Sequence, residues 1–121
     1  MDNPKFEFYT RPNGHNEFME FYHSLPSKDQ EKLMALISMV QDKGLLVDQR
    51  MEWVKKLDKE IFEIRSKFAS NIQRALYFHI SGNRFIITHG FTKKSQRTPY
   101  SEIQRAKIIK REFEEESHDN H

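Results

Sequence analysis

The residues that could do chemistry gather in one stretch, 84–99, of this 121-residue chain. The stretch begins with the apolar strand core 85–87, and a histidine, an aromatic residue and several cations follow at once. These residues are His89, Phe91, Lys93, Lys94 and Arg97. Cations at the end of a buried strand are well placed to hold a phosphate, because charge-assisted hydrogen bonds to phosphate oxygens are strong. The stretch therefore predicts one wall of a phosphate-binding site.

Two arginines on neighbouring strand-like runs could complete that site. Arg65 ends the run 61–65, and Arg74 lies near the start of the run 72–80. A planar guanidinium grips two phosphate oxygens and stays charged. Cleavage of RNA by the adjacent 2′-hydroxyl needs a base for that hydroxyl, cations on the phosphorane-like oxygens and an acid for the 5′-oxygen. The candidate catalytic residues are therefore Arg65, Arg74, His89, Lys93 and Lys94.

The roles of these candidates differ, and each also has a purely structural alternative. His89 has the side-chain type that titrates near neutrality, and the two lysines could add charge or take part in proton transfer. The candidate RNA-binding residues are Lys55, Lys56, Phe91 and Arg97. Phe91 could stack on a base, a contact that contributes ~1–3 kcal/mol in nucleic-acid sites. Equally, His89 and Phe91 could belong to the core, Arg65 could pair with Glu63 or Glu60, and the lysines could be a solvated edge.

The net charge of +2 conceals a strong asymmetry along the chain. Residues 1–49 carry five Lys and Arg against eight Asp and Glu, residues 50–111 carry fifteen against five, and residues 112–121 carry none against five. A basic block inside a nearly neutral chain is typical of a protein that binds a polyanion or an acidic protein. A solvated, lysine-rich surface is the alternative.

Composition and motifs argue against several other chemistries. The chain has no cysteine, which excludes a disulfide scaffold, a thiolate nucleophile and a cysteine-based zinc site. The motifs G-x-x-x-x-G-K-[ST], G-x-G-x-x-G and H-E-x-x-H are missing, and the six histidines are scattered. We therefore expect no metal and no cofactor. The sequence shows no signal peptide and no apolar run of about 20 residues, so we expect a cytoplasmic protein that does not enter a membrane.

The N-terminal half predicts a strand over 5–9 and two helices over 16–25 and 28–43. Ser27 is expected to cap the second helix, with Gln30 completing a capping box. Gly44 is placed to end that helix as a left-handed residue. A mixed linker over 45–60 follows, and within it lies the run Trp53-Val54-Lys55-Lys56-Leu57.

The second half predicts strands over 61–65, 72–80 and 84–91 and a helix over about 99–114. The short connector 81–83 indicates a hairpin, so antiparallel pairing is expected. Thr98 is expected as the N-cap of the last helix, with Pro99 at its first position, and the acidic tail from about 114 is expected to fray. The predicted fold is a single α+β domain over 1–121. It has a small antiparallel sheet with two N-terminal helices packed on one face and a C-terminal helix.

Four short motifs stand in order along this half. They are E-I-R at 63–65, Q-R-A-L-Y-F at 73–78, H-G-F-T-K-K at 89–94 and T-P-x-x-E-I-x-x-A at 98–106. In this order they resemble the phage-derived HigB-type branch of the RelE/ParE toxin superfamily. The resemblance covers about 53–113, and the N-terminal helices match in pattern only.

The resemblance implies a RelE-like fold and the toxin of a type II toxin–antitoxin pair. Such toxins are generally metal-independent endoribonucleases that cut mRNA, commonly in the decoding site of the ribosome. In this branch the neutralising partner is a helix-turn-helix antitoxin of the HigA type. The resemblance also places Arg65 and Arg74 at the family's two strand arginines. The alternatives are a non-catalytic ParE-like toxin that binds DNA gyrase and an inactive relative; the His-x-Phe-x-Lys-Lys pattern favours the nuclease.

Overall fold

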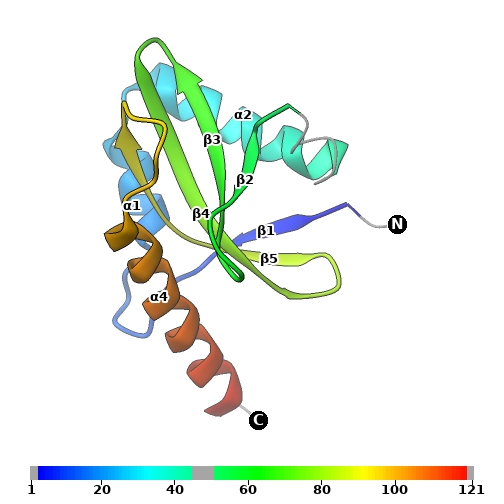
Figure 1. The fold of residues 1–121 in the computed structure, drawn as a ribbon. Coiled ribbons are helices and arrows are strands. Elements are labelled where there is room, and N and C mark those ends of the chain that lie inside the picture. The colour runs from blue at the N-terminus through cyan, green and yellow to red at the C-terminus, as the bar shows by residue number, and fades with distance from the viewer. Residues whose placement is uncertain (1–2, 45–50, 120–121) are drawn as a thin grey trace.

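The computed structural model describes residues 3–44 and 51–119, with side chains up to residue 117. Residues 45–50 of the expected linker and 120–121 of the expected tail lie outside this description. Figure 1 shows the described elements, which follow along the chain as β1 (Lys5–Phe8), α1 (Glu17–Ser24), α2 (Ser27–Lys43), β2 (Val54–Lys56), β3 (Phe62–Phe68), β4 (Asn71–Ser81), β5 (Arg84–Lys93) and α4 (Tyr100–Asp119). The α+β class predicted from the sequence is confirmed.

The strands form one five-stranded sheet in the order β1-β5-β4-β3-β2. β1 runs parallel to β5, while the other neighbours are antiparallel. The expectation of an antiparallel sheet is therefore wrong in this respect, because the sheet is mixed. Alternation shows which residues of a strand share a face but does not fix the direction of the neighbouring strand. β2, which lies within the expected linker, forms one edge of the sheet.

The central strand β4 is apolar on both faces. Ala75 and Tyr77 pack in the core that α1 and α2 cover, whereas Leu76 and Phe78 pack in a second core with Ala106 of α4. Apolar side chains on both faces of a strand require a cover on each. The helix layout therefore differs in detail from the expected one: α4 lies on the face opposite α1 and α2.

The two ends of α2 show one wrong and one confirmed prediction. Ser27 is the first residue of the helix, Pro26 is its N-cap, and no side chain caps it. Gln30 instead donates from Nε2 to the carbonyl of Tyr22 at 2.9 Å, so the predicted capping box does not form. Gly44 has φ of +87° and donates its N–H to Val40, as expected of a glycine that ends a helix.

α4 differs from the prediction at both ends. Thr98 does not cap it, because the Thr98 hydroxyl is bonded within the sheet, as described below. The acidic tail does not fray at 114, since the helix continues to Asp119. Glu112 accepts two hydrogen bonds of 2.9 Å from Arg11, and Glu116 accepts one from Tyr9. The acidic residues of this segment therefore fasten α4 to the segment that follows β1.

Gly90 of β5 lies where Phe21 of α1 meets the sheet. A Cβ atom at this position would contact Phe21 closely and come within 2.8 Å of the carbonyl oxygen of Arg74. We predict that Gly90→Ala lowers the free energy of unfolding by about 1–3 kcal/mol, because overpacking forces the helix or the strand to shift. Urea unfolding measures this loss. The double variant Gly90→Ala with Phe21→Ala should lose less unfolding free energy than the sum of the losses in the two single variants. A loss equal to that sum would contradict the contact.

Candidate functional site

β3, β4 and β5 bring the two predicted arginines together on one face of the sheet. Arg65 lies opposite Arg74, and Arg74 lies opposite Phe91. The next row on the same face consists of Glu63, Leu76 and His89. Alternate residues of a strand share a face, and these two rows lie on the face that α4 covers. Four of the sequence candidates are therefore neighbours, as the site hypothesis requires.

Arg74 is fully buried, and its guanidinium is bonded to the chain itself. Nη1 donates to Thr98 Oγ1 at 2.8 Å, and Nη2 donates to the carbonyl of Ser95. Burial lowers the pKa of Arg74; the Glu63 carboxylate opposes this effect, and Arg65 adds to it. Without exposure to solvent, this guanidinium holds the protein's own backbone in the place where a phosphate was expected.

Arg65 bonds the same segment from the neighbouring strand. Its Nη2 donates to the carbonyl of Gln96, and its Nε forms an ion pair with Glu63. Glu63 is fully buried and also accepts a hydrogen bond from the hydroxyl of Thr98. The Arg65 side chain is 9% exposed, so it reaches the surface only at its margin. The pairing with Glu63 left open by the sequence is thus present.

These bonds pin the segment 94–99 onto the sheet. Two of its carbonyls accept from arginines, and Thr98 lies between Arg74 and Glu63. The charged side chains of the segment point outward, since Lys94 and Arg97 are exposed. The buried network thereby fixes the backbone that presents two of the predicted cations to solvent.

His89 is buried beneath the first turn of α4. Its Nδ1 lies 3.0 Å from Thr88 Oγ1, and its Nε2 lies 3.3 Å from Glu102 Oε1 without a hydrogen bond. Burial lowers the pKa of His89 to about 3; Arg105 lowers it further, and Glu17 opposes the shift. The ring is therefore neutral at neutral pH and has no contact with solvent.

Phe91 also belongs to the interior. It is 8% exposed and packs in the core beneath α4. The guanidinium of Arg74 lies 5.7 Å from its ring centre, and the ring of His89 lies 6.2 Å away. Phe91 therefore packs against Arg74 and His89. An RNA base could stack on its ring only after a change of conformation.

Several exposed cations without an ion pair lie at one end of the sheet. Lys67 lies opposite Ile72, which in turn lies opposite Lys93, so these lysines and Arg65 lie at the same end. In the described part of the chain, five exposed cations of this region have no carboxylate partner: Lys55, Lys67, Lys93, Lys94 and Arg97. We call these five, together with Arg65, the cationic end.

Three of the four cations of α4 contrast with the cationic end, because carboxylates pair with them. Arg105 pairs with Glu17, Lys107 with Asp58 at 2.6 Å, and Lys110 with Glu114 at 3.1 Å. Unpaired positive charge of the 50–111 block is thus denser at the cationic end than along the helix.

A small hollow opens at the cationic end. It has a volume of about 280 Å³ and is lined by Glu52, Val54, Lys55, Arg65, Lys67 and Gln96. Lys55 lies opposite Glu63 and so shares the face of Arg65, whereas Lys56 lies opposite Phe62 and points to the other face. Lys67 was not among the sequence candidates, because the predicted strand ended at Arg65. Its spacing of two residues from Arg65 is the signal that could have found it.

The described residues hold no group of three or more His, Cys, Asp or Glu side chains that could bind a metal ion. Nor does this part of the chain contain a helix of the length and apolarity that a membrane span requires.

Residues 20–111 match the family described as Phage derived protein Gp49-like (DUF891), and the chain belongs to this family. The search of curated proteins gives no match.

The buried network yields a prediction for Arg74→Ala. The substitution leaves a cavity and removes one of the two cations beside the buried Glu63 carboxylate, so it should lower the free energy of unfolding by about 3–5 kcal/mol. Lys93→Ala, at an exposed residue without a carboxylate partner, should change it by no more than about 0.5 kcal/mol. Urea unfolding of both variants tests this. Equal stability of Arg74→Ala and wild type would contradict the anchoring role.

His89 should make stability fall in mild acid. Unfolded histidine has a pKa of about 6.5, while His89 in the folded chain has a pKa of about 3. Below pH 6.5 the unfolded state binds a proton that the folded state does not bind. This contribution to stability is therefore complete above pH 6.5 and is lost as the pH falls toward 3. Between pH 7 and pH 5 we expect a loss of about 2 kcal/mol from this residue.

Urea unfolding of wild type and of His89→Gln at both pH values isolates that loss. The variant should lack it, whereas His23→Gln, at an exposed histidine of α1, should keep it. The same pH dependence in wild type and His89→Gln would overturn the assignment.

Proposed function

We propose that this protein is the toxin of a type II toxin–antitoxin module and an endoribonuclease that cuts mRNA on the ribosome. The Gp49-like family is related to the RelE/HigB-type toxins, which supports this class. The observation that carries the proposal is the cationic end, where exposed and unpaired cations gather and two of them, Lys55 and Lys67, line a small hollow. Its expected partners are mRNA, the ribosome and a helix-turn-helix antitoxin of the HigA type.

The proposed chemistry is transfer of the phosphate to the neighbouring 2′-oxygen. The 2′-oxygen attacks phosphorus after losing its proton, the bond from phosphorus to the 5′-oxygen breaks, and that oxygen takes up a proton. The products are a 2′,3′-cyclic phosphate and a 5′-hydroxyl. Negative charge grows on the phosphate oxygens in the transition state, where Lys93, Lys94 and Arg97 would stabilise it. Arg65 adds charge at the margin of the hollow.

Two of the predicted catalytic residues lie in the interior and do not face the cationic end's surface. His89 is buried and neutral, and Arg74 is bonded to the loop, so neither meets a ligand in this conformation. The cationic end thus offers charge rather than a base suited to neutral pH. We therefore propose that cleavage takes place in the ribosome, where ribosomal RNA positions the mRNA and its reactive hydroxyl.

The burial of His89 and Phe91 favours a second candidate function as well. A ParE-like toxin that inhibits DNA gyrase by binding needs a complementary surface and no proton transfer. The cationic end would then meet an acidic surface of that enzyme. The two candidates differ in what happens to cellular RNA.

Mapping of RNA 5′ ends after brief induction in cells without antitoxin separates the two functions. We expect new ends within mRNAs and arrest of growth. Lys93→Ala with Lys94→Ala should reduce both by about tenfold or more, since each charge-assisted contact contributes about 1.5–3 kcal/mol. Lys5→Ala with Lys59→Ala, a matched pair of exposed lysines away from the cationic end, should behave as wild type.

Two results would count against the nuclease. Intact transcripts together with a rising DNA-damage response would support gyrase as the target. Normal growth on induction of a folded wild-type chain would indicate an inactive relative.

A further inference from the structure

A second hollow lies between α2 and the edge of the sheet, and it shares Glu52, Arg65 and Lys67 with the hollow at the cationic end. It has a volume of about 480 Å³, and its apolar lining includes Leu36, Met39, Met51 and Trp53. Met39 and Met51 are 40% and 56% exposed, although large apolar side chains are normally covered. We call this hollow the edge groove. Its apolar part belongs to the face that α1 and α2 cover, whereas Arg65 and Lys67 at its rim also belong to the cationic end.

The sheet edge beside the edge groove is left unpaired. β2 pairs with β3 only at Phe62–Ile64, and one further bond of 2.8 Å joins the N–H of Arg65 to the carbonyl of Trp53. The last residues of β3, 66–68, have no strand partner on that side in the described part of the chain. Backbone groups alternate in direction along a strand, so Lys67 turns its N–H and C=O toward the open edge, as Arg65 does.

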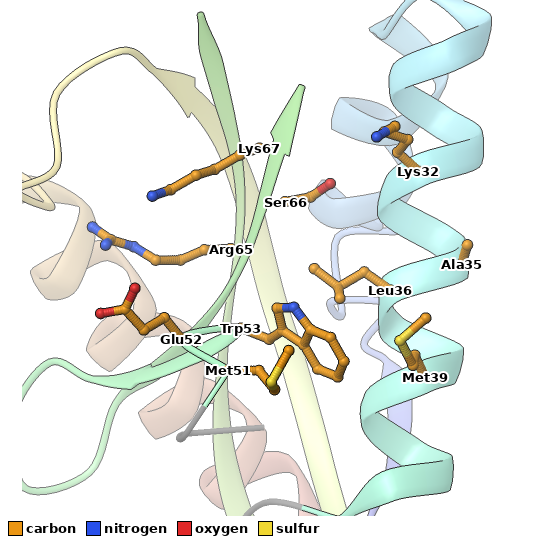
Figure 2. Close-up of a pocket in the computed structure, with 10 residues that line it drawn as sticks. All are labelled: Lys32, Ala35, Leu36, Met39, Met51, Glu52, Trp53, Arg65, Ser66 and Lys67. Carbon is orange, nitrogen blue, oxygen red and sulfur yellow. The ribbon is translucent and has the colours of Figure 1, made fainter. Parts of the chain in front are cut away.

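The two sides of this edge differ in chemistry. Figure 2 shows Arg65 and Lys67 extending to one side of β3, while Trp53 and Leu36 lie on the other side, between the strand and α2. A strand added at the edge would direct alternate side chains to these two sides. One set would enter the edge groove, and the other would lie on the side of Arg65, Lys67 and Glu52 (Figure 2). Arg65 is already paired with Glu63, so Lys67 is the one of these two cations without a carboxylate partner among the described residues.

The geometry points to a docking site for an extended, acidic segment of a partner protein in which apolar residues alternate with Asp or Glu. The apolar residues fill the edge groove, the acidic residues meet the exposed Lys67, and the segment's backbone pairs with Lys67. This inference does not rest on the proposed nuclease function.

Charge also argues against a second copy of this chain as the occupant. Pairing of two identical edges about a two-fold axis would bring Lys67 and Arg65 of each copy against the same residues of the other. Like charges directly opposite on paired strands are destabilising. Lysine on an edge strand is a common means of preventing such self-association. An acidic segment removes this repulsion.

The single tryptophan of the chain provides a direct readout. Trp53 lines the edge groove, so filling the groove should shift its emission to shorter wavelength. The probe is a short acetylated peptide in which Glu alternates with Leu and Val. One control peptide has the same composition with the Glu residues in a block, and another has Lys in place of Glu. We expect a saturable shift with the first peptide that both controls lack.

Two substitutions test whether the peptide binds in the edge groove. Met39→Gln removes an apolar wall, and Lys67→Glu reverses a facing charge; each should weaken binding by about tenfold. Ile108→Gln, at another exposed apolar residue but on α4, should have no effect. Amide hydrogen exchange should show protection of Lys67 when the peptide is bound.

Three outcomes would overturn the inference. The first is no shift in emission at any accessible peptide concentration. The second is equal binding of the alternating and the block peptide. The third is an emission shift that follows protein concentration without peptide, because that result would assign the edge groove to a second copy. None of these measurements involves RNA, so their failure is separate from failure of the nuclease proposal.

Discussion

The buried guanidinium of Arg74 is the interaction on which the end of the sheet depends. A charge without solvent exposure is tolerated only when it is paired and hydrogen-bonded, and here Thr98, Ser95 and the nearby Glu63 carboxylate meet that requirement. The same bonds fix the segment 94–99 over the sheet. Arg74 was predicted to contact a ligand, but in the structure it holds the segment that carries the exposed cations.

Both faces of the sheet are covered by helices, because the central strand is apolar on both sides. β4 is apolar on both sides, so α1 and α2 cover one core and α4 covers the other. The α4 face then changes along the strands, from packed apolar side chains to the Arg65–Glu63 ion pair and the buried, hydrogen-bonded Arg74, and finally to exposed lysines. At the opposite end of α4, Arg11 and Glu112 fasten the helix to the chain beyond β1. The helix that closes the second core is therefore held at both ends.

Much of this architecture could be predicted from periodicity and turn chemistry, including the helical stripes of α1 and α2, the glycine that ends α2 and the β4–β5 hairpin. Three features could not. The parallel direction of β1 depends on a partner 79 residues away in the chain. Thr98 does not cap α4, because its hydroxyl is bonded to Arg74 and Glu63, which only the tertiary structure brings near it. The burial of His89, Arg74 and Phe91 is set by α4 and the segment 94–99, and a strand pattern does not show what lies above it.

The central claim is that the cationic end binds RNA through its exposed cations, and the salt dependence of binding tests it most directly. The affinity of a labelled single-stranded RNA should fall as salt rises, with a slope of about 0.7 in log affinity against log salt for each phosphate contact. Replacing Lys93, Lys94 and Arg97 together with alanine should reduce that slope by about 2 while the fold is retained. An unchanged slope in the triple variant would contradict the claim.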